Sequence, residues 1–346
     1  MRIRFLAGAA LFLSAGASAE GPDIKSLEAY VHPQQRVEVA PGRALNLVCM
    51  GSGQRTVLFE AGGSDWSVIW ALVQPEVARH ARACAYDRAG LGYSDPGPGA
   101  RSPIAIVEDM HAMVVAAGLK RPLVVVGHSL GGFNAKLYAA LYPDEVAGLV
   151  LVDPAEERDW ERTGPMLEKK FGRSLAAKAE LLDRSFRTDL TARYARCRDA
   201  VVGAPLDPNS TTYRRCSDAP RAQLGPVIAA ERQRIQVTAA YQKAQASEII
   251  DSIYGGAGSD AVYSRLFRSG MMGRKPVIVL THGQFDPEDP LDVLGQEQGL
   301  AVHRETARLS AVGLQRTVPD SGHNFPVEKP EVVISAVKEV LTRVGQ

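Results

Sequence analysis

Short apolar runs alternate along the chain with longer segments in which apolar residues recur every three to four positions. The runs at 123–126, 148–152 and 276–280 are almost entirely aliphatic, which predicts strands that are buried on both faces. Helical spacing appears at 66–78, 104–114, 134–142 and 296–311, and again from about residue 330. Strands that alternate with helices in this way are typical of an α/β fold with a mostly parallel central sheet and helices on both faces.

The hydrophobic pattern changes in one long internal segment. Before it, residues 36–39 and 44–49 predict a hairpin, and 56–60 and 82–86 predict further strands. From 155 to 270 the chain is charged and helix-periodic, and the strand pattern returns only afterwards, including a strand at 314–318. We therefore predict a core made of residues 20–154 and 271–346, with a helical cap, 155–270, inserted after the strand that ends at Asp153. Such a cap would lie at the carboxyl edge of the sheet, where open α/β folds bind ligands.

A Gly-His-Ser-Leu-Gly run at 127–131 lies between a predicted strand and a predicted helix. This is the G-x-S-x-G pattern in the setting that a nucleophile elbow requires. Side chains at Gly127 and Gly131 would collide with the neighbouring strand or helix, and the sharp turn would present Ser129 above the sheet. The alternative is a glycine-rich turn with a solvated serine, but strand, turn and helix together favour a catalytic Ser129.

The N-terminus has the features of a secretory signal peptide. Arg2 and Arg4 precede an apolar stretch at 5–13, and the small residues at 17–19 form an A-x-A cleavage site. We predict a signal peptide, 1–19, cleaved after Ala19, and export to the periplasm or the exterior. The stretch is shorter than the roughly 20 residues of a membrane span, so no stable membrane anchor is expected.

Charge and cysteine content bear on the partners and the cellular compartment of the protein. The formal net charge of the full chain is +1, which argues against a nucleic-acid partner. Four cysteines, an even number, fit disulfide formation in an oxidising compartment. No spacing of metal ligands and no glycine-rich nucleotide-binding motif is present, so no cofactor is expected.

Four segments resemble the α/β-hydrolase superfamily, in particular its lid-bearing, esterase-like serine hydrolases. They are Phe-Glu-Ala-Gly-Gly at 59–63, Tyr-Asp-Arg-Ala-Gly-Leu-Gly-Tyr-Ser at 86–94, the run at 127–131, and Asp-Ser-Gly-His at 320–323. In the second segment, Gly90 and Gly92 permit tight turns, and we expect Arg88 to pair locally. The resemblance implies the α/β-hydrolase fold and a Ser-acid-His triad in that chain order.

The resemblance implies Ser129 as nucleophile and His323, in a loop after the last strand, as the base that takes its proton. The acid has two candidates. Asp286 matches a G-x-x-D pattern after the strand that follows the cap, and it is slightly preferred; Asp153, at the end of the strand after the nucleophile helix, is the alternative. The resemblance also implies an oxyanion hole made by the backbone N–H groups of Leu130 and Gly63.

The four cysteines are expected to form two disulfides. In the resembled fold the strand that ends at Cys49 lies beside the strand that contains Cys84, so these two residues can pair. Cys197 and Cys216 flank a polar loop inside the cap, where a bridge would stabilise a segment that has few core contacts. The alternative is four free or buried thiols.

These observations predict an exported hydrolase that cleaves a small carboxylic ester through an acyl-enzyme on Ser129. C–C bond hydrolases, amidases and perhydrolases use the same triad and remain alternatives, as does a non-catalytic binding protein of this fold. Haloalkane dehalogenases and epoxide hydrolases are excluded, because they need an aspartate in place of Ser129.

Overall fold

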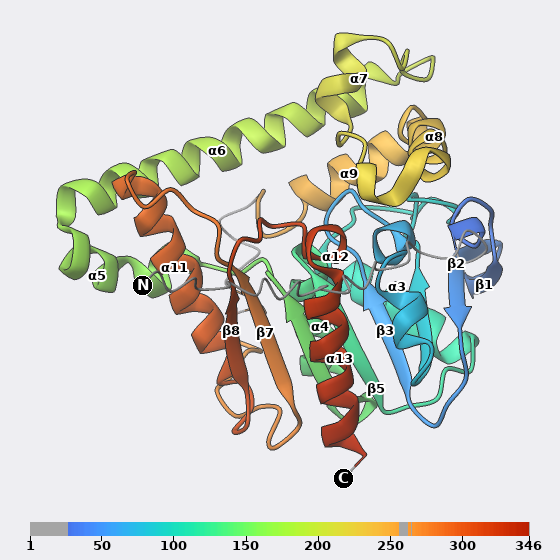
Figure 1. The fold of residues 1–346 in the computed structure, drawn as a ribbon. Helices are drawn as coiled ribbons and strands as arrows, with labels where there is room; N and C mark the ends of the chain where they lie inside the picture. Colours follow the sequence, from blue (N-terminus) through green and yellow to red (C-terminus); the bar gives the residue numbers. More distant parts are fainter. Residues whose placement is uncertain (1–26, 256–261, 264, 346) are drawn as a thin grey trace, which may run out of the picture.

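The protein is built on one eight-stranded sheet, seen in a computed structural model that describes residues 27–255, 262–263 and 265–345 (Figure 1). The predicted signal peptide, 1–19, lies outside the described residues. The strands have the order β1-β2-β4-β3-β5-β6-β7-β8. Their bounds are β1 (Gln35–Ala40), β2 (Arg43–Met50), β3 (Thr56–Glu60), β4 (Arg82–Tyr86), β5 (Leu123–His128), β6 (Val146–Val152), β7 (Val277–His282) and β8 (Leu314–Val318).

The sheet is mostly parallel, as predicted. β1 and β2 form the predicted antiparallel hairpin, and β2 pairs antiparallel with β4. All strand pairs from β4 to β8 are parallel. The carboxyl ends of these parallel strands therefore lie at one edge of the sheet, and the loops after β3, β5, β6 and β8 meet there.

Successive side chains of each strand point to opposite faces of the sheet, so they are divided between two hydrophobic layers. In β5, Val124 and Val126 belong to one buried cluster, whereas Leu123 and Val125 belong to the other. The first layer is completed by α2 (Gln74–Val77) and α13 (Pro330–Val344). The second is completed by α3 (Pro103–Ala116), α4 (Leu130–Leu141) and the end of α11 (Pro290–Ala307). Because both faces are covered, the strands read as continuous apolar runs.

The segment between β6 and β7 is mainly helical and extends over the carboxyl edge of the sheet. Figure 1 shows its longest helix, α6, running across that end of the molecule, with α7, α8 and α9 beside it. Leu167 of α5 and Ala176 of α6 pack with Leu294 of α11, which attaches this end of the segment to the core. The bounds are α5 (Asp159–Phe171), α6 (Arg173–Ala200), α7 (Thr211–Cys216), α8 (Gly225–Gln236) and α9 (Ala239–Ile250).

Two predicted helices differ from those observed. The segment 66–78 forms a 3-10 turn, η1 (Ser67–Trp70), and the short helix α2. Pro75 has no N–H to donate, so one continuous helix would lose a backbone hydrogen bond there. The helix predicted at 296–311 begins earlier, at Pro290, where Asp289 caps it by accepting from the Leu291 N–H at 2.9 Å. No helix of the described ranges is both long and apolar enough to cross a bilayer.

Candidate active site

Ser129 occupies the turn between β5 and α4. Its φ of 52° and ψ of −122° lie outside the regions that L-residues commonly adopt. Its backbone N–H donates to the Val152 carbonyl at 3.0 Å, which holds the turn against β6. A Cβ added at Gly127 would lie 2.2 Å from the Gly131 carbonyl oxygen, and one at Gly131 would lie 2.3 Å from that of Ala61. The turn thus has the crowded geometry that the glycine spacing predicts.

His323 and Asp153 lie in contact at the same edge of the sheet. His323 follows β8, and its Nδ1 donates to Asp153 Oδ2 at 2.5 Å. Asp153 directly follows β6, has a φ of 45° and is 4% exposed. Because Nδ1 bonds the carboxylate, Nε2 on the other side of the ring is left to face a reacting group. The structure therefore provides an imidazole oriented by a buried carboxylate.

Asp286, the preferred acid in the sequence, is not brought to His323. It lies in an exposed loop after β7, where its Oδ1 accepts from the Glu288 N–H at 2.9 Å and its own N–H donates to Asp292 at 2.7 Å. The loop faces solvent, and the Asp286 carboxylate stabilises the turn by its hydrogen bond within the loop. The order of preference between the two acids is therefore reversed, in favour of Asp153.

A second histidine, His282, shares the Asp153 carboxylate. Its Nδ1 lies 3.0 and 2.9 Å from the two carboxylate oxygens, and its backbone N–H donates to Oδ1 at 3.1 Å. Burial raises the pKa of Asp153, but hydrogen bonds from His282 and His323 outweigh it and hold that pKa well below its usual range. The hydrogen bond to Asp153 raises the pKa of His282, against the opposing effect of burial. The carboxylate is thus kept ionised between two imidazoles.

His128, inside the elbow, fixes the loop that contains His323. Its Nε2 donates to the His323 carbonyl oxygen at 2.8 Å, and the two ring centroids are 4.8 Å apart. Burial, and then the neighbouring His323, lower the pKa of His128 to about 3. His128 is therefore neutral at physiological pH and acts through hydrogen bonding. The sequence placed it beside the nucleophile but did not indicate this partner.

The loop after β3 lies against the nucleophile turn. A Cβ added at Gly62 would be 3.3 Å from Ser129 Cβ, and one at Gly63 would be 3.5 Å from Leu130 Cδ2. Leu130 begins α4, so its N–H has no acceptor inside that helix. The structure therefore brings together Gly63, Leu130 and Ser129, the three residues for which the sequence predicts an oxyanion hole and its nucleophile.

Arg88 does not pair locally, contrary to the prediction. Its Nε and Nη2 donate to the Glu248 carboxylate of α9 at 2.6 and 2.9 Å, across 160 residues of sequence. Both side chains are essentially inaccessible, at 1% and 0% exposure. The pairing depends on how α9 folds back over the sheet, which no local pattern could reveal.

Ser129 and His323 line one cavity of about 470 Å³ between the sheet edge and the cap. Burial raises the pKa of Tyr254, just after α9, and the nearby Ser129 side chain opposes that rise. The cavity lining is about equally polar and apolar, and its polar side chains include Asp65, Asp218, Arg221, Gln223, Asn324 and Glu328. Within the described ranges, no three His, Cys or carboxylate side chains are arranged to hold a metal ion.

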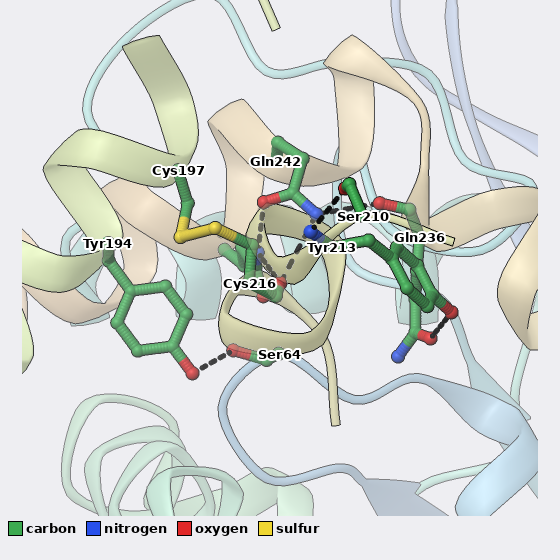
Figure 2. Close-up of a disulfide and its surroundings, with 9 residues drawn as sticks. Ser64, Tyr194, Cys197, Ser210, Tyr213, Cys216, Gln236 and Gln242 are labelled. Carbon is green, nitrogen blue, oxygen red and sulfur yellow. Dashed lines mark hydrogen bonds between the residues drawn. A yellow bond between two sulfur atoms is a disulfide. The ribbon is translucent and has the colours of Figure 1, made fainter. Parts of the chain in front are cut away.

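Both expected disulfides are present. Cys49 and Cys84 face each other in the β2–β4 register, with Cα atoms 4.1 Å apart. Cys197 and Cys216 join α6 to α7, with Cα atoms 5.5 Å apart (Figure 2). In the described part of the chain no cysteine is free. The second bridge lies beside the contact between Tyr194 of α6 and Ser64 of the loop after β3.

Comparison with known proteins agrees with this architecture. The family model described as alpha/beta hydrolase fold matches residues 55–330. A thermophilic esterase from Thermogutta terrifontis superimposes with a TM-score of 0.56 at 23% identity, covering 90% of this chain and 100% of the esterase. The meta-cleavage product hydrolase CumD from Pseudomonas fluorescens gives 0.55 at 17% identity, covering 90% of this chain and 98% of CumD.

The fold, the turn at Ser129 and the family match define the class of protein: this chain belongs to the alpha/beta hydrolase fold family. Among curated proteins, YqjL of Bacillus subtilis is 32% identical over 105 residues, which is 30% of this chain and 42% of YqjL. The match thus spans less than half the length of that relative. The two structural neighbours are under 25% identical, so they bear on the fold and not on the substrate.

Proposed function

We propose that the protein is a serine hydrolase that cleaves a carboxylic ester, with Ser129, His323 and Asp153 as its triad. The observation that supports this most is the 2.5 Å hydrogen bond from His323 Nδ1 to Asp153, at the cavity that Ser129 also lines. An imidazole held by a buried carboxylate is what a serine hydroxyl needs in order to become a nucleophile at neutral pH.

The proposed reaction has two stages. Ser129 Oγ attacks the ester carbonyl while its proton passes to His323 Nε2, and the N–H groups of Leu130 and Gly63 stabilise the oxyanion. The intermediate collapses, the alkoxide leaves with the proton from His323, and an acyl-enzyme remains. Water, deprotonated by the same imidazole, then releases the carboxylic acid and restores Ser129. Asp153 stays ionised throughout and stabilises the imidazolium.

The test is covalent labelling combined with ester hydrolysis. The purified protein should react with a fluorophosphonate probe and hydrolyse p-nitrophenyl butyrate, and Ser129→Ala should abolish labelling and lower kcat by about 10⁶-fold. Ser174→Ala, at an exposed serine of α6, is the matched control and should leave both unchanged. A Ser129→Ala variant that still takes up the probe would contradict the assignment. Assays with an amide of the same acyl group and with a ketone substrate of C–C bond hydrolases would distinguish esterase activity from amidase and C–C bond hydrolase activity.

We further propose that the protein is exported and oxidised. Two disulfides within the described residues are compatible with this, and the sequence supplies the predicted cleavage site after Ala19. N-terminal sequencing of the mature protein should begin at Glu20. A mature chain that retains Met1 in the cytosolic fraction would refute export.

A further inference from the structure

The loop 61–65 is held from the core side by Arg88. Its Nη1 donates to the Ala61 carbonyl at 2.6 Å, and its Nη2 donates to the Gly62 carbonyl at 2.7 Å. Nη2 also lies 3.1 Å from the Asp65 carbonyl oxygen. One guanidinium group thus fixes three carbonyl groups of a single short loop.

Fixing the Gly62 carbonyl also fixes the Gly63 N–H. The two groups belong to the same planar trans peptide, so they point in opposite directions. When Arg88 binds the Gly62 carbonyl, the Gly63 N–H is directed away from Arg88. Gly63 lies against Leu130, the residue that follows the nucleophile. The orientation of the proposed oxyanion donor is therefore set by the position of the Arg88 guanidinium.

The position of Arg88 is set in turn by the cap. Glu248 of α9 accepts from Nε at 2.6 Å and from Nη2 at 2.9 Å, a two-point contact that fixes the plane of the guanidinium. The other acidic neighbour, Glu60, is more distant, at 3.3 Å from Nη1. Because Arg88 is 1% exposed, water cannot replace a lost carboxylate, and the charge would be left poorly compensated.

Other cap residues hold the far side of the same loop. Arg232 of α8 donates to Asp65 Oδ1 at 2.6 Å, and Arg221 lies 2.8 Å from Asp65 Oδ2. The Tyr241 hydroxyl donates to the Ser64 carbonyl at 2.8 Å, and Ser64 has a left-handed φ of 65°. Tyr194 of α6 reaches the Ser64 hydroxyl at 3.3 Å (Figure 2). The cap therefore contacts Ser64 and Asp65, the two residues of the loop that follow Gly63.

We infer that Glu248 is a positioning residue for the oxyanion loop, and that the cap contributes to the chemical step as well as covering the cavity. This inference rests on the proposed function, because it assumes that Gly63 stabilises an oxyanion. Weakening the ion pair between Glu248 and Arg88 should therefore weaken binding of the transition state and leave binding of the ground-state ester almost unchanged.

The experiment uses Glu248→Gln in the full-length mature protein with p-nitrophenyl butyrate. The substitution keeps the size of the side chain and removes its charge. Removing one oxyanion-hole donor lowers kcat by about 10²–10³-fold in serine hydrolases, so a displaced donor should lower kcat by about 10–100-fold. KM should change less than threefold. The Ki of an alkyl trifluoromethyl ketone, which forms a hemiketal oxyanion on the serine, should rise by the same factor as kcat/KM falls.

Asp109→Asn is the matched control. Asp109 is a buried carboxylate paired with two arginines, Arg43 at 2.5 Å and Arg101 at 2.7 Å, and it makes no contact with the loop 61–65. Its loss should lower the melting temperature but leave kcat and the Ki of the ketone unchanged. Glu248→Asp keeps the charge on a shorter side chain, so its kcat should lie between that of the unsubstituted protein and that of Glu248→Gln. It remains the test if Glu248→Gln folds poorly.

A folded Glu248→Gln or Glu248→Asp variant with unchanged kcat would overturn the inference. So would a fall in kcat that leaves the Ki of the ketone unchanged, because the loss would then not involve the oxyanion. Failure of the proposed function has a different signature: the unsubstituted protein itself would neither react with the fluorophosphonate nor hydrolyse the ester.

Discussion

Replacing Asp153 by asparagine tests the orientation of His323 with the smallest change of shape. In the structure, Asp153 Oδ1 accepts from the His282 backbone N–H at 3.1 Å, and Oδ2 accepts from His323 Nδ1 at 2.5 Å. An asparagine has only one acceptor. If its oxygen keeps the bond to the His282 N–H, its NH₂ group faces His323 Nδ1 and becomes a donor there.

The consequence is a change of tautomer in the catalytic imidazole. His323 Nδ1 would have to accept, so the proton would move to Nε2, the nitrogen that should take the proton from Ser129. Serine hydrolases with this defect lose about 10⁴ in kcat, equivalent to about 5.5 kcal/mol of transition-state stabilisation. We expect a loss of that order for Asp153→Asn, with KM changed only slightly.

The assay is the steady-state hydrolysis of p-nitrophenyl butyrate at pH 7.5, with folding checked by circular dichroism. Asp286→Asn is the matched control, since it makes the same chemical change at the other candidate acid, whose contacts are confined to its own loop. It should keep kcat within about twofold. The reasoning would be refuted if Asp153→Asn kept more than a tenth of kcat, or if Asp286→Asn lost more than a hundredfold.

Two further predictions concern stability. Burial lowers the pKa of His128 to about 3 in the folded protein, so below pH 6.5 the unfolded chain binds a proton that the folded protein does not. The free energy of unfolding should therefore fall by on the order of 5 kcal/mol between pH 6.5 and 3. In urea titrations His128→Gln should reduce this dependence of stability on pH, and an unchanged dependence would contradict the low pKa of His128. The bridge between Cys197 and Cys216, 19 residues apart, should contribute about 3 kcal/mol in the chain-entropy model. The Cys197→Ser, Cys216→Ser double variant should therefore unfold at a lower urea concentration than the unsubstituted protein, and limited proteolysis should cleave its cap before its core. A cap as resistant to protease as that of the unsubstituted protein would count against this prediction.

The sequence was most informative where a pattern is local. The strand predicted at 314–318 has the bounds of β8, and the glycine spacing around Ser129 predicted a turn that the structure contains. Pro75 was the local signal that should have divided the helix predicted at 66–78. The early start of α11 likewise had a readable signal, an aspartate followed by a proline at 289–290.

The candidate site was less predictable because two of its contacts depend on the tertiary fold. Asp153 and Asp286 both follow strands of the same sheet edge, and nothing in the spacing reveals which loop turns inward. The pairing of Arg88 with Glu248 requires a helix of the cap to return over the sheet, and the proximity of Tyr254 to Ser129 has the same origin. Glu248 and Tyr254 belong to no motif that could have indicated their roles.

The place where the cap enters the fold has a consequence for recombining this protein with its relatives. β6 and β7 are adjacent and parallel, so the chain leaves the sheet at the carboxyl end of β6 and re-enters it at the amino end of β7, where Val277 pairs with Leu149. A foreign cap could be spliced there without altering strand order. The graft would still have to supply a carboxylate where Glu248 stands, since Arg88 remains in the recipient interior. Whether a chimera folds therefore depends more on a partner for the buried Arg88 charge than on how the chain is joined to β6 and β7.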